Sequence, residues 1–376
     1  MQIKRIKIET AKLEAGMYVA QLDRPWLETP FLFQGFEIRE DAELDQLRHY
    51  CRDVYIDVSK GSLPADRIED VLNRREQSET PLATETRIPR ANKSPLFRFL
   101  RLLAFVDPTG AISRRLDAPR VYQNIVSTRK ESPAAAEAYR YTHEKIDGVL
   151  SSLRDGETLQ LEEVQMAVTQ IVDSVLRNPD ALGWFLLLQQ HDNYSYNHSI
   201  ATAVWSAVVG RHLGFDRDNL EKLAMGGLLL DIGKTRIPED ILRKPGELNK
   251  YEYGLMQQHV EFGIDMATSS RGVSSEVLDM IACHHERHDG SGYPRGESGA
   301  SIPVFGRIAG IVDCYDAMTS SQPHSPAKSA YQAIRELNSL VGTQFQAELV
   351  EQFVQALGMF PTGTIVELNT GEVGVV

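Results

Sequence analysis

The 376-residue sequence has few of the features that mark secreted, membrane-spanning or disulfide-stabilised proteins. Its cysteines are Cys51, Cys283 and Cys314, an odd and widely spaced set that excludes a disulfide framework and is typical of a reducing compartment. No apolar run follows the basic residues of the N-terminus, so no signal peptide is expected. The longest uncharged run of the central region, 199–210, is too short to span a bilayer. We therefore expect a cytoplasmic protein without membrane insertion.

Positive charge is also scarce. The sequence has 40 lysines and arginines against 52 aspartates and glutamates, which gives a net charge of −12 at pH 7. Broad binding to nucleic acid needs a positive surface that displaces counterions from the phosphates. The charge balance therefore excludes a general nucleic-acid-binding function, but it leaves room for a local basic pocket that holds a small anionic ligand.

The distribution of apolar residues and prolines divides the sequence into four regions. Alternating polar and apolar residues in the first region predict short strands, with one helix between them at 40–51. Prolines among charged and small polar residues in the second region are typical of a linker or mobile arm. The four regions are a small β-rich domain at 1–60, a linker or arm at 61–97, a helical connecting region at 98–184, and a helical domain with a terminal hairpin at 185–376.

Helical periodicity dominates from about residue 98 onward. Asn249 and Glu252 have the spacing of a capping box, which predicts the start of the helix that carries His259. The last residues form two apolar stretches around a turn sequence, which predicts a β-hairpin. The expected fold is mainly α, with a small β-rich (α+β) N-terminal domain and a short C-terminal β-hairpin. Helices are predicted at 134–153, 162–176, 197–213, 219–232 and 255–266.

Seven of the ten histidines lie between residues 191 and 288. Several of them, and two aspartates, fall on or beside separate predicted helices, so a helical bundle would bring them together. Imidazole and carboxylate ligands suit Fe, Mn, Zn or Ni better than Mg or Ca. Taken alone, His198 or His259 is better explained as a core or rim residue, whereas the adjacent pair at 284–285 and Asp313 in an apolar helix need partners when buried. The interpretation therefore depends on the whole set. The candidate metal ligands are His198, Asp231, His259, His284, His285 and Asp313.

Several ordered motifs resemble those of the HD-GYP family. The stretch 284–294, HHERHDGSGYP, is similar to the loop that defines the family. The stretches 231–234 (DIGK), 244–246 (KPG) and 342–345 (GTQF) agree with it, and the resemblance covers roughly 185–360. Residues 16–31 resemble an uncharacterised domain that often precedes HD-GYP units in bacteria.

This resemblance implies the helical bundle of the HD superfamily and hydrolysis of the second messenger cyclic di-GMP to pGpG or GMP. It implies one or two divalent transition-metal ions (Fe, Mn, Zn or Ni) on the six candidate ligands, the second position being filled or empty. Asp231 would bridge two ions, and Lys234 would lie near the phosphate as a point charge. A protein partner at the GYP loop or at the N-terminal domain is a further expectation. Substrate-binding roles are implied for Gly290, Gly292, Tyr293, Pro294, Arg287 and Arg307.

Five positions depart from the family's pattern. Leu230 stands where the family has a metal-binding histidine, and a leucine cannot bind a metal. Tyr194 stands where some members have a glutamate that supports a third metal ion. Gln322 and Ser325 replace basic residues that hold the ligand phosphate, and Gln346 replaces an aspartate.

Three functions stay open on the sequence. The first is cyclic di-GMP hydrolysis at a degenerate metal site, with weak or lost activity. The second is a non-catalytic module that binds cyclic di-GMP or a protein, and the third is a phosphohydrolase for another cyclic nucleotide. Removing even an outer partner of a metal ligand costs roughly 10–100-fold in metal affinity or activity. The loss of a ligand at position 230 is therefore expected to reduce hydrolysis strongly.

Overall fold

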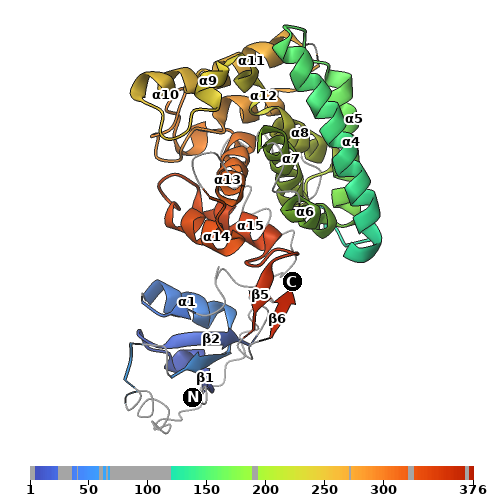
Figure 1. Cartoon of the computed structure of the whole chain (residues 1–376). Coiled ribbons are helices and arrows are strands. Elements are labelled where there is room, and N and C mark those ends of the chain that lie inside the picture. Colours follow the sequence, from blue (N-terminus) through green and yellow to red (C-terminus); the bar gives the residue numbers. More distant parts are fainter. Residues whose placement is uncertain are drawn as a thin grey trace. The chain divides into compact units, whose positions relative to one another are not determined.

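The computed structural model divides the chain into two compact units, residues 1–91 and 92–376, and each is described by itself (Figure 1). The linker predicted at 61–97 lies almost wholly outside the described residues, so the four predicted region boundaries stay predictions. The described residues are 5–23, 36–39, 41–58, 62–64, 67, 120–188, 194–270, 272–320, 326–368 and 372–376.

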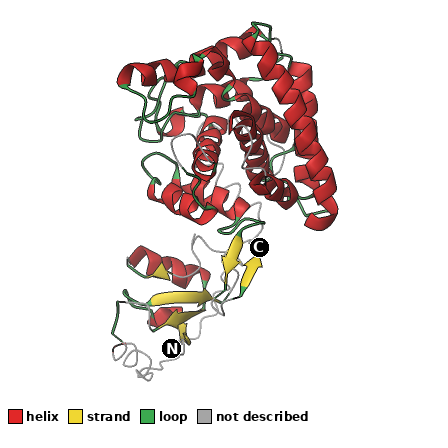
Figure 2. Ribbon diagram, in the orientation of Figure 1, coloured by secondary structure: helices red, strands yellow, loops and turns green. Residues whose placement is uncertain are grey.

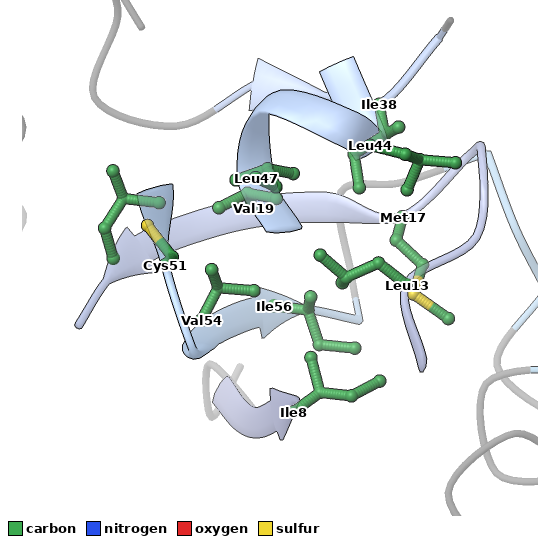
Figure 3. Close-up of a cluster of buried hydrophobic side chains, with 11 residues drawn as sticks. Ile8, Leu13, Met17, Val19, Ile38, Leu44, Leu47, Cys51, Val54 and Ile56 are labelled. Carbon is green, nitrogen blue, oxygen red and sulfur yellow. The ribbon is translucent and has the colours of Figure 1, made fainter. Parts of the chain in front are cut away.

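Among its described residues, the N-terminal unit forms an antiparallel sheet of four strands together with helix α1, as its alternating sequence predicts. Val54 and Ile56 are fully buried in β4, whereas their neighbours on that strand alternate toward the other face. Figure 3 shows these side chains beneath helix α1, which contributes Leu44 and Leu47 to the same core. The strand order is β1-β4-β2-β3. The elements are β1 (Arg5–Glu9), η1 (Thr10–Lys12), β2 (Tyr18–Leu22), β3 (Phe36–Glu37), α1 (Asp41–Tyr50) and β4 (Asp53–Asp57).

The second unit is a bundle of helices, as the three-and-four periodicity predicts (Figure 2). Helix α7 packs against α5, α8 and α13, and its residues from 198 to 210 are almost all buried. Helices α4 and α5 pack against each other, and α4 also contacts η3. The first helices are α4 (Thr128–Arg154), α5 (Leu161–Arg177), α6 (Pro179–Leu188), α7 (Tyr194–His212) and α8 (Arg217–Leu229).

The rest of this unit alternates short helices with loops and ends in the predicted hairpin, whose strands pair antiparallel. Within the described part of the chain, no helix combines the length and the apolar character that crossing a membrane requires. All three cysteines are free in the structure, and Cys51 and Cys283 are buried. The remaining elements are η3 (Ile232–Arg236), α9 (Glu239–Leu242), α10 (Lys250–Gln257), α11 (His259–Ser269), α12 (Ser275–Cys283), η4 (Gly299–Ser301), α13 (Val304–Thr319), α14 (Ala330–Ser339), α15 (Ala347–Leu357), β5 (Ile365–Glu367) and β6 (Val373–Val375).

Two predicted helices are broken in the structure. The helix predicted at 219–232 ends at Leu229, and a 3₁₀ turn begins at Ile232. The capping box of Asn249 and Glu252 is confirmed, but it opens α10, which ends one residue before Gln258. His259 is the first residue of a separate helix, α11. Apolar periodicity averages over several turns, so it does not detect a break of one or two residues.

An ion pair between the buried Glu131 and the partly exposed Arg177 joins the two long helices α4 and α5. The carboxylate of Glu131, whose side chain is 3% exposed, accepts hydrogen bonds from Arg177 Nε (2.9 Å) and Nη2 (2.8 Å). Ser174 Oγ donates a third hydrogen bond to it at 2.9 Å. The arginine thus neutralises a carboxylate that the surrounding helices remove from water.

We expect Arg177→Ala to lower the free energy of unfolding of the helical unit by about 3 kcal/mol, because it leaves the Glu131 carboxylate buried without its counter-charge. Urea denaturation followed by the fluorescence of Trp184 and Trp205 measures the change. Arg217→Ala is the matched control, since the carboxylate with which Arg217 pairs, that of Asp173, is 37% exposed and stays in contact with water. That variant should lose less than about 1 kcal/mol. Equal losses in the two variants would contradict the prediction.

Candidate metal centre

The six predicted ligands come together where the ends of several helices meet. His198 lies in α7 and Asp313 in α13, while Asp231 follows the end of α8. His259 opens α11, and the 284–285 pair follows α12. Helix α13 packs against both α7 and α12, and α8 packs against α7 and α12, so these segments share one interior. The exposed fractions of the six side chains run from 0% at His284 to 17% at His285.

Hydrogen bonds to main-chain carbonyls determine which nitrogen of two histidines carries the proton. His259 Nδ1 lies 2.7 Å from the carbonyl oxygen of Met256, and His284 Nδ1 lies 2.9 Å from that of Ile281. A carbonyl oxygen only accepts, so both Nδ1 atoms are the donors and both Nε2 atoms carry lone pairs in the neutral rings. These two Nε2 atoms are 3.3 Å apart. Two lone pairs therefore face each other in a buried space.

The carboxylate of Asp231 adds negative charge to the same space. Its Oδ1 atom lies 3.4 Å from His259 Nε2 and 3.8 Å from His284 Nε2. This oxygen is buried and accepts no hydrogen bond, although buried polar atoms are nearly always satisfied. With His285, these residues form a group whose donor atoms all lie within 4.8 Å of one another. The two Nε2 lone pairs and the Asp231 oxygen point into one space with no proton shared between them, and a cation would satisfy all three. The residues therefore fit a divalent transition metal ion.

A second set of donors lies beside the first. His198 Nε2 is 3.1 Å from Asp313 Oδ1 and 3.4 Å from Asp231 Oδ2. Leu230, the residue before Asp231, is fully buried and contributes no ligand atom. The second set therefore has three donor residues, one fewer than the first.

Asp316 is a site residue that the sequence analysis missed. Its Oδ2 atom lies 2.7 Å from His198 Nδ1, and its side chain is buried. A carboxylate in this position orients the imidazole ring, so that the other nitrogen, Nε2, faces Asp231 and Asp313. The signal in the sequence was its spacing, because Asp316 follows Asp313 by three residues on α13 and so lies on the same helix face.

Burial and neighbouring charges shift the pKa values of the candidate ligands toward the ionisation states that metal binding needs. Burial lowers the pKa of His259 to about 4, lowers that of His284, and takes that of His285 well below its usual value. Burial by itself would raise the pKa of Asp231, but the ammonium of Lys234 and the contact with His198 outweigh it and hold that pKa well below its usual range. At neutral pH the histidines are neutral and the aspartate is ionised, as metal ligands must be.

Stability of the metal-free protein should consequently depend on the protonation of His259. The histidine has a pKa of about 6.5 in an unfolded chain and about 4 in the fold. Between these pH values the unfolded chain binds a proton that the folded chain does not, so the stability present above pH about 6.5 is lost as the pH falls. We expect a loss on the order of 3 kcal/mol by pH about 4. Urea unfolding in the presence of a chelator, repeated across this range, measures it; a flat profile would contradict it.

Glycine at position 233 allows the segment that carries Asp231 and Lys234 to approach α11. A Cβ atom at this position would lie 1.8 Å from the carbonyl oxygen of His259 and 2.5 Å from the nitrogen of Gly263. Both are main-chain atoms, which cannot rotate away. The absence of a side chain at position 233 therefore permits the close approach of this segment to α11.

We expect Gly233→Ala to separate η3 from α11, to lower the affinity for metal by at least roughly 10-fold, and to cost about 3 kcal/mol of stability. Elemental analysis after dialysis and thermal unfolding measure the two effects. Gly254→Ala in α10 is the control, because a Cβ there meets nothing within 4 Å. Retention of metal by Gly233→Ala at the level of this control would contradict the prediction.

The GYP loop lies against the metal centre. The ring of Tyr293 stacks on that of His285 with centroids 4.5 Å apart. Gly292 makes close main-chain contact with the loop's beginning, since a Cβ there would lie 2.4 Å from the carbonyl oxygen of His285. Glu286, which is buried, accepts hydrogen bonds from the main-chain nitrogens of Arg295 (2.8 Å) and Glu297 (3.0 Å). Glu286 thus ties the two ends of the loop together, a role that the sequence analysis did not assign.

The two arginines predicted to bind substrate make contacts within the protein. Arg287 Nη1 donates to the carbonyl oxygens of His284 and Glu286, both at 3.0 Å. Arg307 Nη1 donates to Gln346 Oε1 at 2.6 Å. Their roles in substrate binding stay predictions, as do those of the loop residues Gly290 (φ 83°), Gly292, Tyr293 and Pro294. Gln322, Ser325 and the side chain of Tyr194 lie outside the described residues.

Comparison with known proteins identifies the family. Residues 186–349 match the HD domain, and residues 5–164 match a domain of unknown function, DUF3391. The chain is 31% identical over 379 residues to the cyclic di-GMP phosphodiesterase PA4108 of Pseudomonas aeruginosa, a match that covers 100% of this chain and 81% of the relative. With its GYP loop and its histidine–aspartate cluster, the chain belongs to the HD-GYP family.

Two further similarities are weaker. A cyclic di-GMP phosphodiesterase of Thermotoga maritima is 34% identical over 171 residues, which is 45% of this chain and 46% of the relative. Bd1817, described as an HDG"Y"P protein of Bdellovibrio bacteriovorus, has a known structure that aligns with a TM-score of 0.48 and 13% identity over 93% of this chain and 98% of its own.

Proposed function

We propose that this chain is a cytoplasmic, bacterial cyclic di-GMP signalling protein of the HD-GYP phosphodiesterase type, whose metal centre is incomplete and whose hydrolysis is weak or lost. The observation that carries the proposal is the buried Oδ1 atom of Asp231, which has no hydrogen-bond donor and faces the lone pairs of His259 and His284. The names of the related proteins support cyclic di-GMP as the ligand.

Each residue of the centre has a distinct task in this proposal. A divalent metal ion, when bound, would act as a Lewis acid on the phosphoryl oxygen. Asp231, His259, His284 and His285 would hold it with four donors. Lys234, whose Nζ donates to Asp231 Oδ2, keeps that carboxylate ionised and provides a positive charge for the phosphate.

Leu230 is the reason for proposing weak activity. The second position has donors only from His198, Asp231 and Asp313, and transition-metal sites in proteins commonly use four ligands. A pair of ions stabilises both the attacking and the leaving oxygen of a phosphodiester, and a single ion stabilises them less well. A chain that retains only the first ion would therefore still bind the ligand phosphate but hydrolyse it slowly.

Metal analysis combined with product analysis tests the proposal. We expect the purified protein to hold about one transition-metal ion per chain and to convert cyclic di-GMP to pGpG or GMP at well below the roughly 1 s⁻¹ of an ordinary enzyme. Chromatography detects the products, and calorimetry measures binding. Turnover at ordinary rates would overturn the proposed impairment. A protein that binds no metal and no cyclic di-GMP would overturn the function itself.

A non-catalytic binding module is the second candidate, and the buried leucine at position 230 favours it. In that case calorimetry shows binding of cyclic di-GMP, but no product forms even in long incubations. A partner protein would then read the bound state through the GYP loop or the N-terminal unit. Hydrolysis of another cyclic nucleotide but not of cyclic di-GMP would favour the third candidate, a phosphohydrolase with a different substrate.

A further inference from the structure

Aromatic rings form a continuous strip from the metal centre toward solvent. The ring of Tyr293 lies 4.5 Å from that of His285 and 6.5 Å from that of His259. On its other side it meets Tyr253 of α10 edge to face, with centroids 6.3 Å apart and an interplanar angle of 77°. Tyr253 is 49% exposed, so the strip ends in a half-open aromatic ring only two ring contacts away from a metal-binding candidate.

The helix that carries Tyr253 is firmly anchored at its start. Asn249 and Glu252 form a complete capping box, in which each side chain accepts a hydrogen bond from the other residue's main chain. Lys244 also forms an ion pair with Glu252, the residue directly before Tyr253. A ring on such a support loses little conformational entropy when a ligand covers it, and that favours tight binding.

The ring contacts place Tyr293 between the candidate metal centre and solvent. One neighbour of Tyr293 is the ring of His285, and the other is the partly exposed ring of Tyr253. A ligand whose phosphate occupies the metal centre can extend along Tyr293 and reach Tyr253.

We propose that Tyr253 is a stacking platform for a purine base of the ligand, a base-binding subsite that rests on the proposed function of the metal centre. Bases stack readily on aromatic side chains, and such a stack contributes enough that alanine substitution typically weakens binding roughly 5- to 150-fold. In a nucleotide the sugar separates base and phosphate, and in this site Tyr293 separates Tyr253 from the histidines. The strip therefore suits a phosphodiester that bears an aromatic base. A simple phosphate ester, which has no base, would leave Tyr253 uncovered.

Tyr251 offers a matched control on the same helix. It is 75% exposed, and two residues of a helix are about 200° apart around its axis, so it points away from the face of Tyr253. The variants to compare are Tyr253→Ala, Tyr253→Phe and Tyr251→Ala, each in the full chain and loaded with metal. Calorimetry with cyclic di-GMP gives the dissociation constant, calorimetry with inorganic phosphate tests the metal centre alone, and elemental analysis gives the metal content.

We expect Tyr253→Ala to raise the dissociation constant for cyclic di-GMP at least roughly 10-fold while its metal content and its phosphate binding stay native. Tyr253→Phe and Tyr251→Ala should bind like the native protein, because the first keeps the ring and the second leaves the strip untouched.

Native binding by Tyr253→Ala would overturn the subsite and leave the proposed function standing. Loss of metal or of phosphate binding in that variant would also overturn it, since the ring would then only support the GYP loop. If Tyr253→Phe weakens binding as much as Tyr253→Ala, the hydroxyl and not the ring makes the contact. Failure of the native protein to bind cyclic di-GMP would instead overturn the proposed function, and the subsite with it.

Discussion

Replacing Asp231 with asparagine is expected to empty the metal centre and to abolish any hydrolysis of cyclic di-GMP. The two side chains have nearly the same shape, so the change removes charge and leaves the packing intact. The carboxylate contributes an oxygen to both sets of donors, Oδ1 facing His259 and His284 and Oδ2 facing His198. Loss of a shared ligand should lower the affinity for metal by more than the roughly 100-fold that an outer partner can cost.

Elemental analysis after dialysis and chromatography of the reaction products measure the outcome for Asp231→Asn. The control is Asp240→Asn, since Asp240 is an exposed aspartate of α9 outside both sets of donors. Its metal content and activity should equal those of the native protein. If Asp231→Asn retains a full complement of metal, the convergence of lone pairs at Oδ1 has a different explanation.

Replacing Leu230 with histidine should have the opposite effect. An imidazole at this position would give the second set of donors the fourth ligand that it lacks beside His198, Asp231 and Asp313. We expect the metal content to rise from about one toward two ions per chain, and the rate of cyclic di-GMP hydrolysis to rise at least roughly 10–100-fold.

The stability of Leu230→His provides a second measurement. Position 230 is fully buried, so without metal the new polar ring should cost about 1–3 kcal/mol. Added metal should restore the lost stability, because an ion that binds only the folded state stabilises that state. Leu229→His is the control: Leu229 is also fully buried, but it lies about 100° around the helix from its neighbour. It should lose stability without gaining metal or activity. Unchanged metal content and turnover in Leu230→His would show that the leucine does not limit the site.

The candidate site was predictable from the sequence as a set of residues but not as a geometry. Adjacent histidines at 284 and 285, and aspartates within apolar segments, indicate ligands because such groups are costly to bury alone. The spacing of these residues along the chain does not say which ring nitrogen points inward. That depends on the carbonyl oxygens of Met256 and Ile281, which only the folded helices bring to the two Nδ1 atoms.

Other features depended on contacts between distant segments. Asp316 supports His198 across 118 positions of sequence, and a bare i+3 spacing on α13 does not single it out. The breaks after Leu229 and at Gln258 arise where η3 packs closely on α11, an approach that the missing side chain of Gly233 permits. Helical periodicity carries no information about such approaches, because it records only which face of each helix is apolar.

The sequence by itself determined the mainly helical fold, the strand alternation of 53–57, the terminal hairpin and the identity of the metal-binding candidates. These features depend on the type of each residue and on the pattern of its neighbours in the sequence. The tertiary structure decided that Asp231 faces both sets of donors, that Leu230 is fully buried, and that Tyr253 continues the strip begun by His285. These relations join segments that are far apart in the chain, and only packing of the helices brings them within reach of one another.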